Sequence, residues 1–342
     1  MTFPTAPEGL TPDFLSDALG RPVSDFRVER FGAGSGIMGM VTRVHLTGPS
    51  GPATIIAKFP SPAAANRAVA RTYDMYEREV RFYRSVAPKI SLRVPACYYA
   101  ALDPGGTDFL LLMEDLGALR VGDQVVGCGL DDAHRIVQAI AGLHATTWGW
   151  RPGADVVCHD NPAQRDGMMA GFRMGWPVVQ AQFADLLPAN ADRLGEAVPA
   201  AVPRLLKLMC SEPTCVAHAD LRLDNVLFDD DAIALVDWQS VCISAPEQDL
   251  AYFVTQSLPE SVRHAEDWVA VYHRALTGHG IDYDLDACRE RYRVCALYLL
   301  CFAVVIAGTL DLSNERGQAL GRTLLGNAMR SLEELNAFSL LD

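Results

Sequence analysis

Residues 218–228 read His-Ala-Asp-Leu-Arg-Leu-Asp-Asn-Val-Leu-Phe, so Asn225 follows Asp220 by five positions and leads into an apolar strand. Twelve residues later, Asp237-Trp238-Gln239 follows a second predicted strand, Ala232–Val236. This arrangement is typical of phosphoryl transfer, where the first aspartate accepts the proton of the attacking hydroxyl. The asparagine and the second aspartate bind Mg²⁺ in that chemistry. We therefore predict Asp220, Asn225 and Asp237 as catalytic residues and the last two as metal ligands. The alternative interpretation is a set of surface-loop carboxylates.

The same segment resembles the aminoglycoside phosphotransferase and choline-kinase-like superfamily, whose loop reads H-G-D-x-x-x-x-N. The run H-x-D-x-R-x-D-N-x-L-F followed by D-W-Q is similar to the ecdysteroid-kinase-like branch. Ala219 stands where the superfamily usually has glycine, which concerns the loop geometry rather than the chemistry. The resemblance implies an α+β, protein-kinase-like fold in two lobes, with a five-stranded antiparallel N-terminal lobe and a larger, mainly helical C-terminal lobe.

The pattern along the first third of the chain agrees with such an N-terminal lobe. Alternating apolar residues predict strands at 26–31, 40–46 and 53–59, and two more strands flank Asp103-Pro-Gly-Gly106. A helix is expected over 62–87, where apolar residues recur with a period close to 3.6. We expect the N-terminal lobe to cover residues 1–116 and the C-terminal lobe residues 117–342.

Helical periodicity dominates the second part of the sequence. We expect helices at about 131–148, 190–209, 247–257, 260–278, 284–309 and 317–337. Residues 153–182 have no clean period and receive no assignment. The apolar run from Cys295 to Leu310 is shorter than the roughly 20 residues that span a bilayer, so we expect a buried core helix and no membrane span.

A glycine-rich segment precedes the second predicted strand. Gly34-Ser35-Gly36-Ile-Met-Gly39-Met-Val41 fits the pattern G-x-G-x-x-G-x-V of loops that cover nucleotide phosphates. A dinucleotide-binding loop would lead into a helix, whereas a strand follows here, and no Gly-Lys-Ser/Thr marks a P-loop. We predict that Gly34, Ser35 and Gly36 contact the nucleotide.

Lys58 stands in the apolar strand Ile55-Ile56-Ala57-Lys58, where a charge is costly unless it is paired or faces a ligand. In kinases such a lysine contacts the α- and β-phosphates and pairs with a helix glutamate. We predict Glu79 as that partner rather than Glu77, which lies on a different face of the helix. The alternatives are a solvated lysine at a strand edge and a solvated glutamate.

The resemblance also implies roles for residues whose local sequence alone does not indicate a function. The backbone of Glu114 and Leu116, after the apolar strand Phe109–Met113, is expected to bind adenine, with Met113 behind it. Asp249, in Asp-Leu-Ala, is expected to brace backbone amides of the loop around Asp220. His218 and His144 are expected to order this region rather than to transfer protons. Arg222 is a candidate contact for the phosphates or the acceptor.

The acceptor is expected to be a small molecule. Ala245-Pro246-Glu247 imitates a protein-kinase motif, but only five residues separate it from Gln239, which leaves no room for a peptide-binding activation loop. The pocket should lie around 155–190 and the C-terminal helices. Possible carboxylates for a polycation are accompanied by arginines in the same helices: Asp267, Asp282, Asp284 and Asp286.

We therefore predict an ATP- and Mg²⁺-dependent phosphotransferase, and the resemblance favours an uncharged or lipophilic alcohol as acceptor. The alternatives are an antibiotic-inactivating phosphotransferase of the aminoglycoside or macrolide type and a non-catalytic nucleotide-binding scaffold. A net charge of −13 disfavours nucleic acid as a partner. Nine scattered cysteines without a C-x-x-C pair, and no signal peptide, predict a reduced cytoplasmic protein.

Overall fold

The computed structural model describes residues 3–31, 38–189, 191–230, 232–310 and 312–342. Its backbone contacts divide the chain into two compact units. The first unit comprises residues 1–89, 93–120 and 234–240, and the second comprises residues 90–92, 121–233 and 241–342. The first unit is therefore assembled from three separate pieces of the sequence.

The first unit is built around a five-stranded antiparallel sheet, as predicted. Its strands are β1 (Asp25–Arg30), β2 (Gly39–Thr47), β3 (Thr54–Pro60), β4 (Cys97–Leu102) and β5 (Phe109–Glu114). The order across the sheet is β1-β2-β3-β5-β4, so the last hairpin is turned to place β5 beside β3. In this register Lys58 lies opposite Val41 on one side and Leu111 on the other. The lysine thus stands in a central strand.

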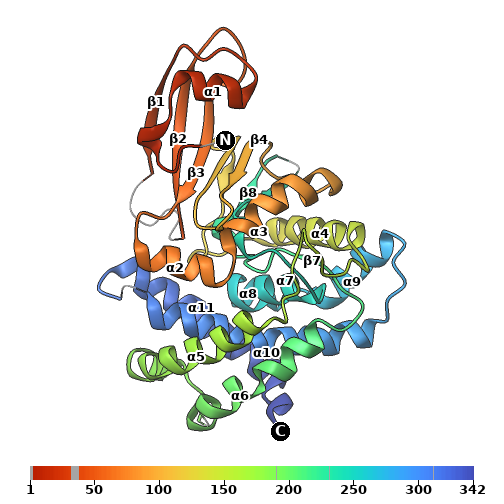
Figure 1. Cartoon of the computed structure of the whole chain (residues 1–342). Coiled ribbons are helices and arrows are strands. Elements are labelled where there is room, and N and C mark those ends of the chain that lie inside the picture. The colour runs from red at the N-terminus through yellow and green to blue at the C-terminus, as the bar shows by residue number, and fades with distance from the viewer. Residues whose placement is uncertain (1–2, 32–37, 190, 231, 311) are drawn as a thin grey trace. The chain divides into compact units, whose positions relative to one another are not determined.

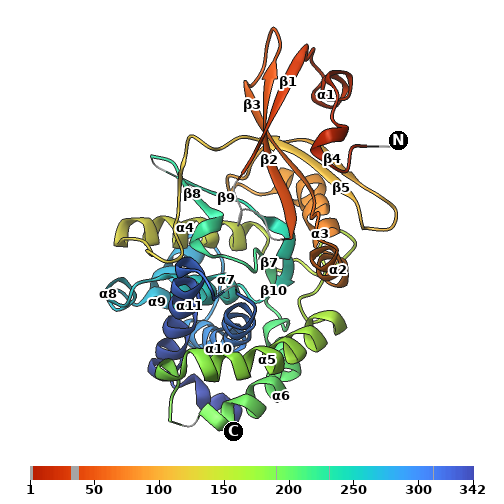
Figure 2. The same ribbon diagram turned by 90° about the vertical axis from the view of Figure 1, so that its left-hand side faces the viewer.

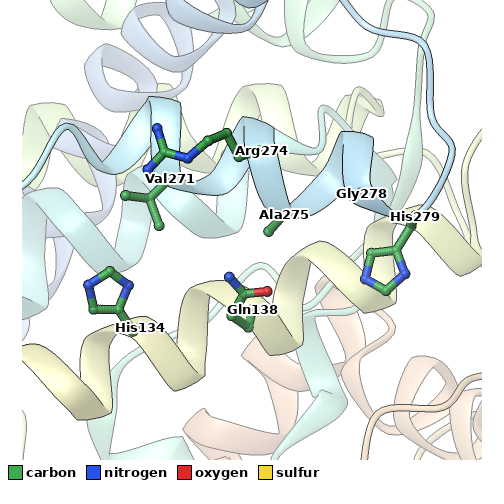
Figure 3. A pocket seen from close by; sticks show the side chains of 7 residues that line it. All are labelled: His134, Gln138, Val271, Arg274, Ala275, Gly278 and His279. Carbon is green, nitrogen blue, oxygen red and sulfur yellow. The ribbon is translucent and has the colours of Figure 1, made fainter.

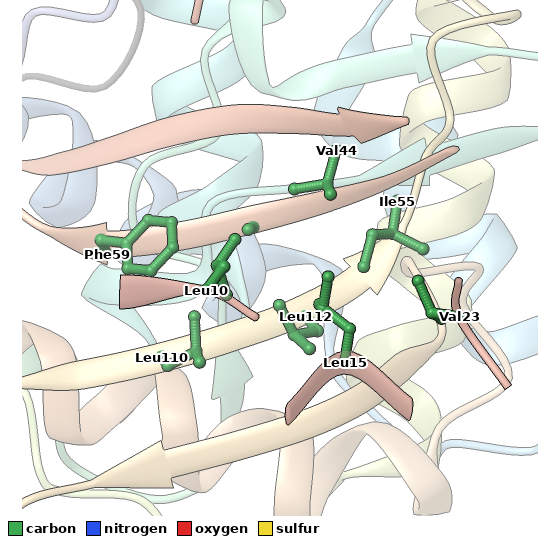
Figure 4. Close-up of a cluster of buried hydrophobic side chains, with 9 residues drawn as sticks. Leu10, Leu15, Val23, Val44, Ile55, Phe59, Leu110 and Leu112 are labelled. Atoms are coloured by element: carbon green, nitrogen blue, oxygen red, sulfur yellow. The ribbon is translucent and has the colours of Figure 1, made fainter. Parts of the chain in front are cut away.

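One face of the sheet packs against helix α1 (Pro12–Leu19). The alternation of β3 puts Ile55, Ala57 and Phe59 on this face, and each is fully buried. Figure 4 shows the resulting cluster, in which side chains from the sheet meet Leu15 of α1. Helix α1 is fixed at both ends, because the Thr11 hydroxyl accepts from the amide of Phe14 and Gly20 ends it in a left-handed conformation.

The single helix predicted over 62–87 is wrong. The structure has α2 (Ala64–Thr72) and α3 (Met75–Arg81), separated by Asp74 with a φ of 53°, and a π-helical turn follows at Phe82–Val86. Aspartate tolerates the left-handed region better than most residues. The restart directs the Tyr76 hydroxyl onto the carbonyl of Met38, at 2.7 Å, and lets it accept from the amide of Ser61. The break therefore ties α3 to the segments that flank β2 and β3.

The second unit is mainly helical. Its helices are α4 (Leu130–Thr146), α5 (Pro162–Gln182), α6 (Ala191–Met209), α7 (Glu247–Tyr252), α8 (Glu260–Arg263), α9 (Trp268–Gly278), α10 (Leu285–Thr309) and α11 (Glu315–Glu334). Helix α10 packs against α5, α6, α7, α9 and α11 and forms the centre of this unit (Figures 1 and 2). The predicted helix 260–278 is two helices, and 247–257 ends in a π-helical turn at Phe253–Ser257.

Helix α10 contains the apolar run noted in the sequence. Among the described residues it is the one helix long and apolar enough to cross a membrane, and 67% of that stretch is buried within the protein. A core helix meets the same criterion of length and composition. The predicted burial of the run from Cys295 to Leu310 is confirmed.

Helix α5 occupies most of the stretch that received no assignment. Its buried apolar residues Met168, Phe172, Trp176 and Val179 recur at helical spacing. Glycines let it approach α10 closely: a methyl group on Gly308 would lie 2.4 Å from the Cα of Gly175. A methyl group on Gly175 would lie 2.7 Å from the carbonyl of Val304. The backbones of α5 and α10 therefore approach each other closely at these glycines.

Short strands complete the structure. Strands β8 (Val226–Phe228) and β9 (Ile233–Leu235) were predicted, and β6 (Arg120–Val121) was not. The sequence also gave no indication of β7 (Cys215–Ala217) and β10 (Cys242–Ser244), which pair antiparallel within the second unit. Strand β7 leads directly into the segment that contains Asp220.

Candidate active site

In the first unit, three predicted site residues meet around one ammonium group. The Nζ of Lys58 lies 2.7 Å from Oε2 of Glu79 and 2.7 Å from Oδ1 of Asp237. Lys58 and Glu79 are almost completely buried. The predicted pairing of Lys58 with Glu79 is confirmed, and Glu77 instead forms an ion pair with Arg81. We call Lys58, Glu79 and Asp237 the charge triad.

The two carboxylates determine the protonation of the triad. Burial alone would lower the pKa of Lys58, but Asp237 and Glu79 raise it above its ordinary value, so the ammonium stays charged. Burial raises the pKa of Glu79; Lys58 opposes this effect and Asp237 adds to it. The triad therefore combines one ammonium with two carboxyl groups, of which Glu79 has its pKa raised to about 7.

Asp237 is held by its neighbour in the sequence. The indole of Trp238 stacks on Phe82, with ring centroids 3.9 Å apart and planes inclined by 7°, and its Nε1 donates to the carbonyl of Leu235. Asp237 itself has a φ of 66°, an unusual conformation for a residue with a side chain. Such strained residues cluster at functional sites, where the surrounding packing maintains them.

The remaining nucleotide-binding predictions fall on two segments. Gly34, Ser35 and Gly36 lie outside the described residues. Met113 and Leu116 are buried at and after the end of β5. The amide of Glu114 donates to the carbonyl of Ala96, the residue before β4, at 2.8 Å. An adenine contact by the backbone of Glu114 would therefore use its carbonyl and not its amide.

In the second unit, Asp249 of α7 braces the segment 218–225, which we call the Asp220 loop. Its Oδ2 accepts from the amide of His218 at 2.7 Å, and its Oδ1 accepts from the amide of Ala219 at 2.8 Å. Behind it, His144 of α4 lies 3.3 Å from the same carboxylate and 2.8 Å from the Tyr272 hydroxyl. The predicted bracing by Asp249 is confirmed. His144 supports the brace and not the loop directly.

Asp249 is ionised in these surroundings. Burial would raise its pKa, but the hydrogen bond and charge of His144, the nearby His218 and the amide of Ala219 together lower it below its ordinary value. A buried carboxylate with both oxygens bonded to loop amides fixes the backbone more firmly than a neutral acceptor would.

The loop brings Asp220 and Asn225 together. The side-chain amide nitrogen of Asn225 donates to the backbone carbonyl of Asp220 at 2.9 Å and lies 3.2 Å from its Oδ2. The ring of His218 accepts from the amide of Asp220 at 3.3 Å. Arg222, also in this loop, places its Nε 3.8 Å from Oδ2 of Asp220. Because the nitrogen of Asn225 is engaged with Asp220, its side-chain oxygen is the atom suited to a cation.

Gln124 is a further residue of this region that sequence reasoning missed. It is completely buried, and its Oε1 accepts from the amide of Leu223 at 2.8 Å and from the hydroxyl of Ser257 at 3.0 Å. Its Nε2 donates to the carbonyl of Gln256 at 2.9 Å. Gln124 thereby ties the Asp220 loop to the end of the helix that carries Asp249.

Tyr252 is the second residue that was missed. It follows Asp249 by three positions on α7, is completely buried, and packs its ring against Phe302 of α10. Burial raises the pKa of Tyr252 well above its usual range, and the carboxylate of Asp220 adds to the effect. Its position one turn from Asp249 is the signal that could have identified it, since both side chains then point to the same loop.

The donor groups fit a magnesium ion. Among the described residues there is no cluster of three or more histidine, cysteine, aspartate or glutamate side chains placed to bind a metal. Asn225 and Asp237 offer hard oxygen ligands, one amide and one carboxylate. Mg²⁺ typically takes one or two carboxylates and completes its coordination with water and substrate phosphates, so a protein-only cage is not required.

A hollow of about 470 Å³ lies elsewhere in the second unit, between α4 and α9 (Figure 3). Its polar lining comes from His134 and Gln138 of α4, Arg274 of α9 and His279 directly after α9. His134 is already engaged with Glu266, at 3.2 Å. The predicted site residues of this unit are on the Asp220 loop and α7, so the hollow does not belong to the candidate site.

Comparison with solved structures confirms the predicted protein-kinase-like fold. A choline kinase from Cryptosporidium parvum Iowa II is 11% identical, with 93% of this chain and 92% of that chain covered and a TM-score of 0.58. An ethanolamine kinase from Plasmodium vivax is 12% identical, with 90% and 84% covered and a TM-score of 0.55. The GDP complex of wild-type aminoglycoside 2'-phosphotransferase-IIIa is 15% identical, with 91% and 94% covered and a TM-score of 0.51.

No curated protein sequence matches the chain. The model of the ecdysteroid kinase-like family matches residues 33–282, which include the charge triad, the Asp220 loop and Asp249. These residues make up well over half of the sequence, and the chain therefore belongs to the ecdysteroid kinase-like family of small-molecule phosphotransferases.

Proposed function

We propose that this protein transfers the γ-phosphoryl group of ATP to the hydroxyl of a small, uncharged or lipophilic alcohol, with Asp220 as the group that accepts the hydroxyl proton. The observation that carries the proposal is the Asp220 loop. There, Asn225 engages Asp220 through both the backbone and the side chain, while Asp249 holds the preceding amides. Family membership supplies the reaction class.

In the proposed reaction, the hydroxyl oxygen attacks the γ-phosphorus as its proton passes to Asp220. The bond from the γ-phosphorus to the bridging oxygen breaks, and ADP leaves with that oxygen. Lys58, held by Glu79, would contact the phosphates. Positioning and electrostatics supply most of the acceleration in such transfers, which is why rigid bracing of the Asp220 loop matters.

Asn225 and Asp237 would hold Mg²⁺, which when bound neutralises the charge of the β- and γ-phosphates. The structures of aminoglycoside phosphotransferases with this fold hold GDP or ADP. We assign ATP as the donor nucleotide, and a comparison of ATP with GTP in the same assay tests that choice.

The surroundings of the acidic residues argue against a polycationic acceptor. Asp267 is paired with Arg289 at 2.6 Å, and Asp284 caps the first turn of α10 by accepting from the amide of Ala287. Two of the four carboxylates considered for an aminoglycoside are therefore engaged. The segment between Gln239 and Ala245 contains β10, which pairs with β7, and this supports a small acceptor over a peptide.

Incubation of the purified protein with Mg²⁺, ³²P-labelled ATP and a panel of alcohols tests the proposal. We expect transfer to a lipophilic alcohol, and loss of at least about 100-fold in kcat for Asp220→Asn. Asp230→Asn, an exposed aspartate after β8, is the matched control and should retain full activity. Equal turnover by Asp220→Asn would overturn the mechanism. Transfer to kanamycin but to no uncharged alcohol would overturn the acceptor class.

A further inference from the structure

Two cysteines stand at the two ends of one helical hairpin. Helices α5 and α6 contact each other and lie side by side along α10 (Figure 2). Cys158 precedes the first residue of α5 by four positions, and Cys210 directly follows the last residue of α6. Both thiols are half-buried, whereas five of the nine cysteines are fully buried. The base of the hairpin therefore carries two cysteines that are not fully buried.

Backbone contacts bring the two cysteines together at β10. Cys158 forms a parallel bridge with Ile243, whose carbonyl accepts from the amide of His159 at 3.0 Å. The sulfur of Cys210 lies 3.7 Å from the same carbonyl and accepts from the amide of Asp160 at 3.2 Å. The Cys210 sulfur thus contacts the bridge partner of Cys158 and the amide two residues after it, which brings the two thiols into the same neighbourhood.

The surroundings of the two thiols shift their pKa values in opposite directions. The contact with Cys210 lowers the pKa of Cys158, and the amide of Asp160 and the charge of Arg165 add to this effect, whereas partial burial and the charge of Asp160 oppose it. Arg165 is fixed nearby by its ion pair with Asp160. The same contact and burial raise the pKa of Cys210. Cys158 is therefore the nucleophile of the pair, and Cys210 is its protonated neighbour.

We propose that Cys158 and Cys210 form a reversible disulfide that closes the α5–α6 hairpin at its base. The oxidant is a low-molecular-weight disulfide such as oxidised glutathione. The Cys158 thiolate attacks one of its sulfurs and releases a glutathione thiolate, which takes the proton of Cys210. The Cys210 sulfur then attacks Cys158 in the mixed disulfide and releases the second glutathione as a thiolate, which is protonated from solvent. Two protein thiols lose two electrons, and the oxidant is reduced to two thiols.

The disulfide would stabilise the protein chiefly by restricting the conformations of the unfolded chain. In the reduced protein the ends of α5 and α6 are joined to β10 only by non-covalent contacts, whereas the disulfide would make the whole hairpin one covalent loop. In a reducing compartment such a bond is transient and responds to the redox poise. This inference does not depend on the proposed reaction, because it concerns thiol chemistry in the folded chain.

The test equilibrates the protein of native sequence in glutathione buffers of increasing oxidation, blocks free thiols with iodoacetamide and maps peptides by mass spectrometry. We expect a crosslinked peptide pair containing Cys158 and Cys210, reversible with dithiothreitol, while Cys97 and Cys128 remain alkylated. The oxidised protein should unfold roughly 5 °C higher than the reduced one.

Variants separate the two roles. Cys210→Ser should accumulate glutathione on Cys158, Cys158→Ser should stay unmodified at Cys210, and Cys128→Ser, which alters another half-buried thiol, should still form the crosslink. A stable mixed disulfide on Cys158 without the crosslink in the native sequence would overturn the proposal. So would a bond from Cys210 to the neighbouring Cys242, or the absence of oxidation at every buffer ratio.

Discussion

Lys58 and Asp220 are charged groups in largely buried surroundings, yet the protein holds them by different means. Lys58, in the first unit, is fixed by two opposite charges, Glu79 and Asp237. Asp220, in the second unit, stands on a loop fixed mainly by hydrogen bonds of its backbone: two loop amides donate to Asp249, and Asn225 donates to the carbonyl of Asp220. The first arrangement depends on charge balance, and the second depends on backbone geometry.

This difference predicts how the stability and activity of each region should respond to substitution. A buried charge without its partner costs several kcal/mol, whereas a lost hydrogen bond costs about 1–3 kcal/mol. The charge triad should therefore be the more sensitive to substitution and to pH. The Asp220 loop should lose activity through small displacements before it loses much stability.

The largest expected effect on stability comes from Lys58→Met. The substitution leaves Glu79 and Asp237 without their cation and should lower the free energy of unfolding by roughly 3–5 kcal/mol. Urea unfolding monitored by circular dichroism measures it. The double variant with Glu79→Gln should recover part of the loss, and no recovery would show that the triad is not a charge-balanced unit.

The Lys58→Met variant should also change how the stability of the protein depends on pH. Burial already raises the pKa of Glu79, and removal of Lys58, which lowers it, should raise it further. The folded variant then binds this proton more tightly than the unfolded chain, so its stability falls as pH rises through the folded pKa of Glu79. The loss relative to the native sequence should be smaller at about pH 5 than at about pH 8. Equal losses would contradict a buried ionised Glu79.

Asp249→Asn should have the next largest effect and tests the second arrangement. An asparagine can accept from only one of the two loop amides and turns a donor toward the other, at a cost of roughly 2–3 kcal/mol. We also expect kcat to fall at least about 10-fold, because Asp220 follows the two amides directly. Asp267→Asn, in an exposed ion pair with Arg289, is the control and should cost less than about 1 kcal/mol.

Gln124→Ala should be milder. It removes the acceptor for the amide of Leu223 and the donor to the carbonyl of Gln256, and should cost roughly 1–3 kcal/mol. Hydrogen exchange should show faster exchange of the Leu223 amide. Gln124→Glu retains the acceptor and should protect that amide again, whereas unchanged exchange in both variants would remove Gln124 from the support of the loop.

The smallest effect is expected for Ala219→Gly. Ala219 has a φ of 64°, where a side chain costs roughly 1–2 kcal/mol. Glycine relieves that strain but gains freedom in the unfolded chain, so the net stabilisation should be no more than about 1 kcal/mol. Thermal unfolding measures the shift. A clear destabilisation would show that the methyl group of Ala219, which is buried, contributes more by packing than it costs by strain.

The sequence was informative wherever a charge interrupts a regular pattern. The charge of Lys58 in an apolar strand, together with the kinase pattern in which such a lysine pairs with a helix glutamate, predicted its pairing with Glu79. The spacing from Asp220 to Asn225 predicted that both lie in one loop before a strand, and the structure adds that their side chains meet there. The roles of these residues in nucleotide and metal binding stay predictions.

The remainder depended on contacts between distant parts of the chain. The break at Asp74 is fixed by the contacts that Tyr76 makes after it, and the close approach of α5 to α10 depends on Gly175 and Gly308, which lie far apart in the sequence. Gln124 is a polar residue in a loop, and it becomes buried only because residues 223 and 256, distant in the sequence, form hydrogen bonds with its side chain. Neither periodicity nor local propensity contains this information.

The segment Ala234–Ser240 belongs to the first compact unit although the chain reaches it only after passing through much of the second. A gene fragment that ends at residue 120 would encode the sheet but neither the indole that covers Phe82 nor the carboxylate that faces Lys58. The first unit is consequently not a portable module. Recombination between relatives could exchange helices of the second unit and so change the acceptor. It would have to preserve the segment Ala234–Ser240, so the two units are constrained to be inherited together.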